Sequence, residues 1–184
     1  MQYIPRAHQV KADAFLREHP RCCLLLDMGL GKTVVTLTYI KDLLDDFAVN
    51  KVLVIAPKRV AEDTWSREKD KWEHLHGLTI SKVMGAGKQR EAALRAQADL
   101  YIINRENVQW LVEYLGSDWC FDTVVIDELS SFKSAQSKRW RSLKRVIRLC
   151  THVIGLTGTP AANGYMDLWS QMYLIDQGEA LGKT

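Results

Sequence analysis

The residues Cys22-Cys23-Leu24-Leu25-Leu26-Asp27-Met28-Gly29-Leu30-Gly31-Lys32-Thr33 decide the fold of this chain. A short apolar run leads into a turn with two glycines, and a helix-compatible segment from Val34 to Leu44 follows. This order predicts a phosphate-binding loop, because glycines let backbone N–H groups approach an anion and the helix presents its positive end to it. Lys32 would then reach the β- and γ-phosphates of a nucleotide, and the Thr33 hydroxyl would hold Mg²⁺.

The loop departs from the generic pattern at one position, because Leu26 stands five residues before Gly31 where a glycine is expected. The alternative interpretation is a glycine turn at a helix start that precedes Lys-Thr by coincidence. The strand before the loop and the helix after it favour nucleotide binding. A second Gly-Lys-Thr, residues 182–184, lacks both neighbours and is interpreted as coincidental.

Composition limits the class of protein. The chain has 184 residues, 47% of them hydrophobic and 26% charged, which suits one globular domain with a core. No apolar run approaches the ~20 residues that span a membrane, and the first five residues show no signal-peptide pattern. The four cysteines have no metal-ligand spacing, so we expect reduced, structural thiols in an intracellular, cytoplasmic protein.

Strand-like and helix-like segments alternate along the chain, which predicts an α/β fold with a mostly parallel sheet. In the helix predicted over 7–19, Val10, Ala14 and Phe15 are expected to face the core. Trp65 and Trp72, one heptad apart in a predicted helix, are also interpreted as core. Beyond the first strand, the apolar runs predict strands at 51–57, 79–83, 99–105, 123–128 and 152–157.

The strand predicted over 123–128 ends in two carboxylates, Asp127 and Glu128. In a nucleotide-binding domain the first carboxylate would bind Mg²⁺ and the second would accept a proton from the water that attacks the γ-phosphate. A solvated pair of acids at a strand end is the alternative. The phosphate-binding loop elsewhere in the chain favours the catalytic interpretation.

A basic segment follows, with seven cations and no acid between Lys133 and Arg148. The apolar residues Trp140, Leu143, Ile147 and Cys150 share one helix face. The opposite face carries Lys138, Arg141, Arg145 and Arg148, and two interpretations stay open for it: a solvated surface, or an electrostatic footprint for nucleic acid.

Taken together, these stretches resemble the superfamily 2 helicases, and within them the Swi/Snf-like DNA translocase branch. The segment 27–33 resembles motif I of that branch, and 156–160 resembles motif III. In place of the family's Asp-Glu-Ala-His, motif II reads Asp127-Glu128-Leu129-Ser130. Both carboxylates are kept, but Ser130 stands where the family has the histidine that makes the coupling contact from motif II. The resemblance implies a three-layer RecA-like P-loop NTPase domain that uses ATP and Mg²⁺.

The resemblance also implies roles for single residues. Pro5, Arg6 and Gln9 resemble the Q motif, which implies that Gln9 reads adenine. Contact with a nucleic-acid backbone, expected to be double-stranded DNA, is implied for Pro57, Lys58, Arg59, Asn104, Arg105 and Lys133. The implied nucleotide-binding residues are Arg6, Gln9, Met28, Gly29, Leu30, Gly31, Lys32 and Thr33. Thr33 and Asp127 are the implied ligands of the metal. A role in coupling ATP hydrolysis to movement on nucleic acid is implied for Thr157, Gly158 and Thr159.

Members of this family have two RecA-like lobes with ATP between them, and the second lobe supplies arginine fingers. This sequence ends soon after motif III, so we expect residues 1–184 to be the N-terminal ATP-binding lobe alone, with a second lobe as its partner. Two alternatives stay open. One is an RNA helicase of the Asp-Glu-Ala-Asp type, which has a different glycine loop and motif III, and the other is a non-catalytic nucleotide-binding module.

Overall fold

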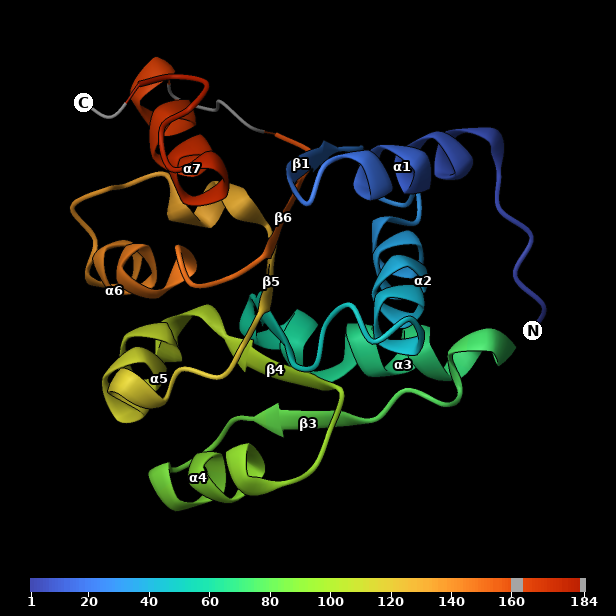
Figure 1. Cartoon of the computed structure of the whole chain (residues 1–184), viewed down its shortest axis with the longest axis horizontal. Helices are drawn as coiled ribbons and strands as arrows, with labels where there is room; N and C mark the ends of the chain where they lie inside the picture. Colours follow the sequence, from blue (N-terminus) through green and yellow to red (C-terminus); the bar gives the residue numbers. More distant parts are fainter. Residues whose placement is uncertain (160–163, 183–184) are drawn as a thin grey trace.

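The structure, a computed structural model, describes residues 1–159 and 164–182. Its centre is a six-stranded sheet in the order β1-β6-β5-β2-β4-β3, with every neighbouring pair parallel. In Figure 1 the labelled strands β1, β6, β5, β4 and β3 follow one another in this order. This confirms the α/β class and makes the sheet wholly parallel. The strands are β1 (Arg21–Leu25), β2 (Val52–Ala56), β3 (Ile80–Val83), β4 (Leu100–Asn104), β5 (Thr123–Asp127) and β6 (His152–Thr157).

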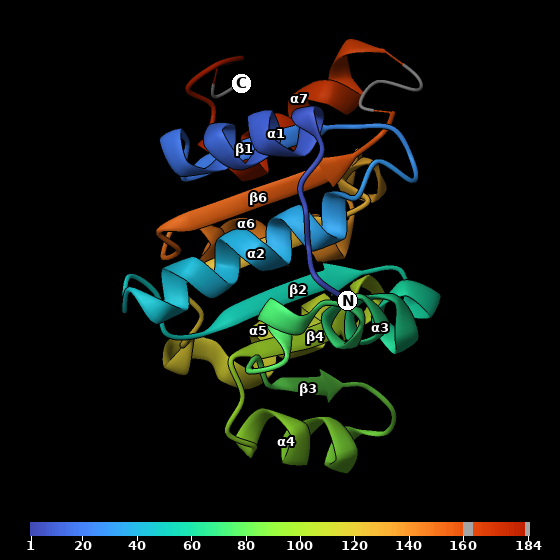
Figure 2. The ribbon, with the colours of Figure 1, turned by 90° about the vertical axis from the view of Figure 1, so that its right-hand side faces the viewer.

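Helices cover both faces of the sheet, as the buried, non-alternating strands require. One face carries α1 (Ala7–Glu18), α2 (Lys32–Asp45) and α3 (Trp65–Lys71), and their apolar residues form one core cluster with alternate residues of the strands. The other face carries α4 (Gly87–Arg95), α5 (Val108–Leu115), α6 (Lys138–Ile147) and α7 (Tyr165–Asp176), around a second cluster (Figure 2).

Strand β2 shows how the two clusters share the sheet. All five of its residues are buried. Val52, Val54 and Ala56 belong to the cluster with α2 and α3, whereas Leu53 and Ile55 belong to the cluster on the opposite face. Successive side chains of a strand point to opposite faces, so one apolar run supplies both cores.

The face of α1 differs from the predicted one. Val10 and Phe15 are 52% and 40% exposed, and Ala14 is exposed as well. The buried residues of α1 are instead Gln9, Ala12 and Leu16. Phe15 stacks on His19 at 4.4 Å between ring centres, so part of its apolar surface is covered within the helix. The prediction was wrong because it used apolar character alone, and the face that packs on α2 includes a glutamine.

Two other predicted helices are shorter or broken. The helix predicted over 60–74 consists of a π-helical turn (Val60–Thr64), α3 and a 3₁₀ turn (Glu73–Leu75), with extended backbone at Trp72. Trp65 is fully buried as expected, whereas Trp72 is only half-buried. The basic helix begins at Lys138 rather than at the start of the basic segment, because Ser137 caps it by accepting from the Trp140 backbone N–H at 3.3 Å.

Within the described residues, no helix has the length and apolar character that a membrane crossing needs. All four cysteines are free thiols, and burial raises the pKa of Cys22 and of Cys23 to about 12. These thiols are therefore protonated and inert at neutral pH.

Candidate functional site

The loop from Leu26 to Gly31 joins β1 to α2 at the carboxyl edge of the sheet. Gly29 and Gly31 both have φ of +81°, a backbone conformation that favours glycine. No atom lies within 4 Å of a Cβ built at Gly29, whereas one built at Gly31 would lie 2.3 Å from Gln9 Nε2. Gly31 is also the N-cap of α2, so the loop ends directly at the positive end of a 14-residue helix.

Lys32 is the first residue of α2, and its side chain returns to the loop. Its Nζ donates to the Leu26 carbonyl at 2.6 Å and to the Asp27 carbonyl at 3.1 Å. The ammonium group is thereby held beside the loop whose backbone N–H groups would surround an anion. Thr33 follows on the same helix turn, and the loop, Lys32 and Thr33 all line one cleft at this edge of the sheet.

Asp127 and Glu128 lie at the carboxyl end of β5, as predicted, but their environments differ. Burial raises the pKa of the Asp127 carboxyl, and the neighbouring Glu128 adds to the shift. The indole N–H of Trp65 donates to Asp127 Oδ2 at 2.9 Å, and this bond, with the charge of Lys32, opposes the shift. Asp127 is therefore a half-buried carboxyl group whose negative form is disfavoured mainly by desolvation, and a bound cation would offset that cost.

Glu128 is exposed and has φ of +56°, unusual for a residue with a side chain. Its Oε2 lies 3.9 Å from Arg105 Nη1. Arg105 also pairs with Glu106 at 3.1 Å, and Asn104 donates to Glu106 at 2.9 Å. The segment that was predicted to contact nucleic acid therefore touches the predicted catalytic base.

Gln9, the predicted adenine reader, contacts the phosphate-binding loop. Its Oε1 accepts from the Arg6 backbone N–H at 2.9 Å, and its Nε2 lies 3.4 Å from the Leu30 carbonyl. His8 Nε2 lies 3.1 Å from the same carbonyl, a contact that no sequence signal indicated. Arg6 and Gln9 both line the cleft.

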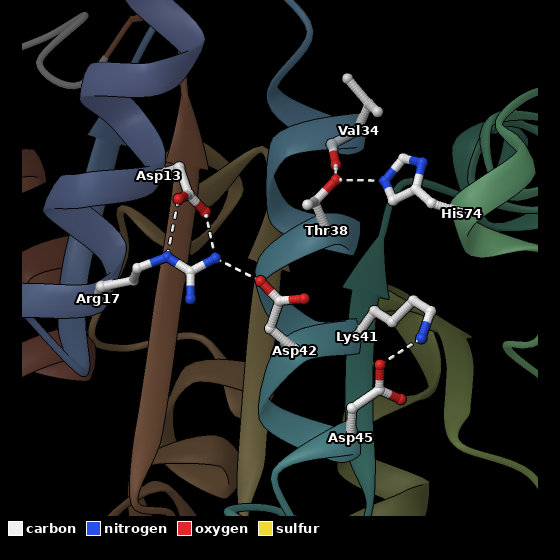
Figure 3. Close-up of polar contacts among 8 residues, drawn as sticks. All are labelled: Asp13, Arg17, Val34, Thr38, Lys41, Asp42, Asp45 and His74. Carbon is white, nitrogen blue, oxygen red and sulfur yellow. Dashed lines mark hydrogen bonds and ion pairs between the residues drawn. The ribbon is translucent and has the colours of Figure 1, made fainter. Parts of the chain in front are cut away.

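Helix α1 is held in place by α2 (Figure 3). Arg17 on α1 pairs with Asp13 on the same helix at 2.8 Å and also reaches Asp42 on α2. On the other side of α2, Thr38 Oγ1 lies 2.8 Å from His74 Nε2, and the His74 ring stacks on Tyr3. Tyr3 also lines the cleft, although no sequence motif points to it.

The end of β6 lies beside the phosphate-binding loop. The Leu26 N–H donates to the Thr157 carbonyl at 3.2 Å, and the Thr159 N–H donates to the Thr157 hydroxyl at 3.2 Å. A Cβ built on Gly158 would lie 3.4 Å from the Leu26 carbonyl oxygen, so this turn and the loop are in close approach. Pro160, Asn163, Lys183 and Thr184 lie outside the described residues.

The predicted nucleotide and coupling residues line one cleft of about 790 Å³. It brings together the loop 28–33 with Arg6, Gln9, Asp127, Glu128 and 157–159, and Ser130 of motif II lines it too. The predicted nucleic-acid residues are absent from the described lining. Of these, Lys58 lies 3.9 Å from Glu62, and Lys133 lies 3.9 Å from Asp167.

The cleft fits a magnesium nucleotide. Gly29 leaves open space beside the loop, and a lysine and a helix start supply positive charge. The described residues contain no group of three metal-ligating side chains, so the protein alone does not build a closed metal site. Mg²⁺ commonly takes one or two protein oxygens and completes its shell with phosphates and water, which suits Thr33 and Asp127.

The fold and the cleft together are those of a RecA-like ATPase-core domain. Residues 8–180 match the model of the SNF2-related domain. The chain is 39% identical to protein p41 of Acyrthosiphon pisum secondary endosymbiont phage 1, over 99% of this chain and 41% of that protein. It is 30% identical to the human DNA excision repair protein ERCC-6-like, over 95% of this chain and 15% of that protein.

A solved structure is similar as well. The Sulfolobus solfataricus SWI2/SNF2 ATPase core in complex with dsDNA matches with a TM-score of 0.81 and 26% identity, covering 97% of this chain and 37% of that chain. The chain belongs to the SNF2-related family. It spans less than half the length of these relatives.

Proposed function

We propose that this chain is the ATP-binding lobe of an ATP-driven translocase of double-stranded DNA. The observation that carries the proposal is the convergence on one cleft of Lys32 from the start of α2 with Asp127 and Glu128 from the end of β5. Lys32 and the N–H groups of the loop bind the β- and γ-phosphates, and Thr33 and Asp127 hold Mg²⁺. When bound, the metal neutralises charge on the phosphate oxygens. Glu128 accepts the proton of the attacking water.

Substitution of Lys32 tests nucleotide binding. Lys32→Ala removes a charge-assisted contact to phosphate and is expected to weaken binding by about 1.5–3 kcal/mol, roughly tenfold to a hundredfold. The measurement is titration of a fluorescent ATP analogue with Mg²⁺. Lys11→Ala, on the exposed side of α1, removes an equal charge away from the cleft and is the control. Equal affinities of wild type and Lys32→Ala would contradict the assignment.

The DNA part of the proposal concerns the residues beside the cleft. Pro57, Lys58 and Arg59 follow β2, and Asn104 and Arg105 end or follow β4, so both groups lie at the carboxyl edge of the sheet. Lysines and arginines at that edge suit the phosphate backbone of a duplex, which carries no sequence information. The Sulfolobus relative solved with dsDNA supports this choice of partner over RNA. A second RecA-like lobe would close over the nucleotide.

Arg105 has a particular place in this proposal. It lies 3.9 Å from Glu128 while it belongs to the segment expected to meet DNA. A duplex phosphate at Arg105 would compete with Glu128 for the guanidinium group and release the carboxylate toward the cleft. The motif II histidine that is expected to couple the two sites in the family is replaced by Ser130 here, and Arg105 offers a direct connection.

A further inference from the structure

Helix α6 has two chemically distinct faces. Trp140, Leu143 and Ile147 are buried in the core cluster on the α4–α7 side of the sheet. The outer face contains only polar and charged groups up to Leu149, which follows the helix and is 57% exposed. The exposed cations of this face, called here the α6 stripe, are Lys138, Arg141, Lys144, Arg145 and Arg148.

The α6 stripe is not neutralised by the protein. Throughout residues 1–159 and 164–182, no carboxylate lies within 4.0 Å of any of its cations. Some exposed arginines elsewhere have such partners, since Arg67 pairs with Asp63 on the α3 side and Arg95 pairs with Glu91 on α4, whereas Arg59 at the edge of the sheet has none among the described residues. The concentration of unpaired charge on one helix therefore distinguishes this surface from the rest of the described molecule.

The stripe has the dimensions of a phosphate-backbone contact. Positions 138, 141, 145 and 148 follow one another at three or four residues, which places them along one side of the helix, and Lys144 lies next to Arg145. From Lys138 to Arg148 the helix rises about 15 Å, and a DNA strand presents about four phosphates over that distance. The Arg141 Nε donates to the Gln136 carbonyl at 3.1 Å, and the Lys144 Nζ lies 4.5 Å from the Tyr173 ring, so two of the cations are held in defined positions.

We propose that the α6 stripe is a second binding surface for duplex DNA, separate from the carboxyl edge of the sheet. Helix α6 packs in one layer with α5 and α7, whereas α3, which follows the edge segment 57–59 in the chain, lies in the other layer (Figures 1 and 2). The choice of DNA as the polyanion rests on the proposed function. A second surface would let the lobe hold a flanking segment while the edge engages the translocated one.

An anionic membrane is the other polyanion that a basic amphipathic helix commonly meets. Such a helix binds by burying its apolar face among the acyl chains. The apolar face of α6 is already buried against the sheet, with Trp140 at 3% and Leu143 at 0% exposure. Arginine-rich surfaces also match the bidentate geometry of phosphate diesters. The structure therefore favours nucleic acid.

The test is the salt dependence of DNA binding by the whole chain. Fluorescence anisotropy with a labelled duplex is measured at about 50 to 200 mM salt for wild type and for Arg141→Gln with Arg145→Gln. Each lost phosphate contact makes the slope of log K against log salt shallower by about 0.9, so we expect a change of about 1.8. At about 50 mM salt, we expect at least roughly tenfold weaker binding. Thermal melting confirms that the variants are folded.

Two comparison variants separate this proposal from the DNA part of the proposed function. Lys11→Gln with Arg95→Gln removes the same charge from exposed positions of α1 and α4, and Lys58→Gln with Arg59→Gln removes it from the carboxyl edge. A slope change in the α6 variant beyond that of the α1 and α4 control supports the second surface, whatever the edge variant does. An α6 variant that behaves like this control overturns the second surface. In that case a weakened edge variant still supports the proposed function, and an unchanged one contradicts both.

Discussion

At the scale of the residue, Asp127 shows a conflict between stability and function. Burial raises the pKa of its carboxyl, so the folded chain holds a proton on this group more tightly than the unfolded chain does. The free energy of unfolding therefore falls as pH rises from the ordinary carboxyl value, about 3.9, through the raised value. Functional groups are often maintained at such a cost.

Asp127→Asn is accordingly expected to stabilise the nucleotide-free chain at neutral pH. The amide carries no charge, and its oxygen can still accept from the Trp65 N–H that now reaches Oδ2. Each kcal/mol recovered raises Tm by about 2–4 °C in a domain of this size. Thermal unfolding followed by circular dichroism between pH 8 and pH 5 measures the effect, and the difference in Tm should shrink as pH falls. A variant less stable than wild type at neutral pH would contradict the argument.

The same variant has an opposite expected effect when nucleotide and Mg²⁺ are present. Ligand binding raises Tm by mass action, and loss of a metal ligand reduces that rise. Asp127→Asn should therefore lose most of the Tm increase that wild type gains from Mg²⁺ and a non-hydrolysable ATP analogue. Repeating the melt with nucleotide and a chelator is the control, because it removes the metal contribution from both proteins. A full Tm increase in the variant would exclude Asp127 from the metal site.

Among the contacts between elements, the phosphate-binding loop packs closely against α1 at Gly31, where the Gln9 side chain leaves no room for a Cβ. Gly29→Ala and Gly31→Ala carry the same backbone strain, about 1–2 kcal/mol, because both residues have φ of +81°. Only the second variant places a Cβ 2.3 Å from Gln9 Nε2. We expect Gly31→Ala to lower the free energy of unfolding by about 1 kcal/mol more than Gly29→Ala does.

A double-mutant cycle in urea isolates this contact. Gln9→Ala removes the nearest clashing side chain, so most of the extra cost of Gly31→Ala should disappear in the Gln9→Ala background, while the contact with Val34 Cγ1 at 3.3 Å remains. Gly29→Ala should cost the same in both backgrounds and is the matched control. Additive effects of Gln9→Ala and Gly31→Ala would show that the loop and α1 are not coupled in this way.

The elements themselves could largely be predicted from the sequence, because glycine turns and long apolar runs are local signals. The contacts between elements could not. Trp65 was identified as a core residue by its spacing, but nothing local indicates that its N–H meets Asp127, 62 residues away. The contact of Arg105 with Glu128 depends on a sheet order in which β2 lies between β4 and β5. The face of α1 was mispredicted for a related reason, because the packing of α1 on α2 determines that Gln9 is buried and Val10 is exposed.

At the scale of the whole molecule, the parallel sheet determines where function can gather. All six strands end at one edge, so the loop after β1, the carboxylates after β5 and the turn after β6 meet there. Asp127 stands opposite Leu156 in the register of β5 and β6, and Leu25 stands opposite Thr157 in that of β1 and β6. Residues more than a hundred positions apart in sequence therefore line one cleft.

The cationic side chains among the described residues of that cleft are Arg6, Lys32 and Lys71, and this set leads to a prediction for residues 1–184. Charge builds on the γ-phosphate oxygens during hydrolysis, and in related phosphate-loop enzymes an arginine facing it is worth roughly 10³ to 10⁵ in rate, about 4 to 7 kcal/mol. Arg6 is the one arginine among the described residues of the cleft, and it lies at the start of α1 beside Gln9. We expect the 184-residue chain to bind ATP and hydrolyse it very slowly.

Steady-state phosphate release with and without duplex DNA measures this, with Glu128→Gln as the background. Duplex DNA should leave the rate near background, because release of Glu128 from Arg105 does not supply a cation that faces the γ-phosphate, which a closing second lobe would bring. A chain that binds the ATP analogue through Lys32 but shows only background release fits an ATP-binding lobe that depends on a partner lobe. A DNA-stimulated turnover of about 1 s⁻¹ or more, lost in Glu128→Gln, would show that residues 1–184 hold a complete catalytic site, with Arg6 the first arginine to examine.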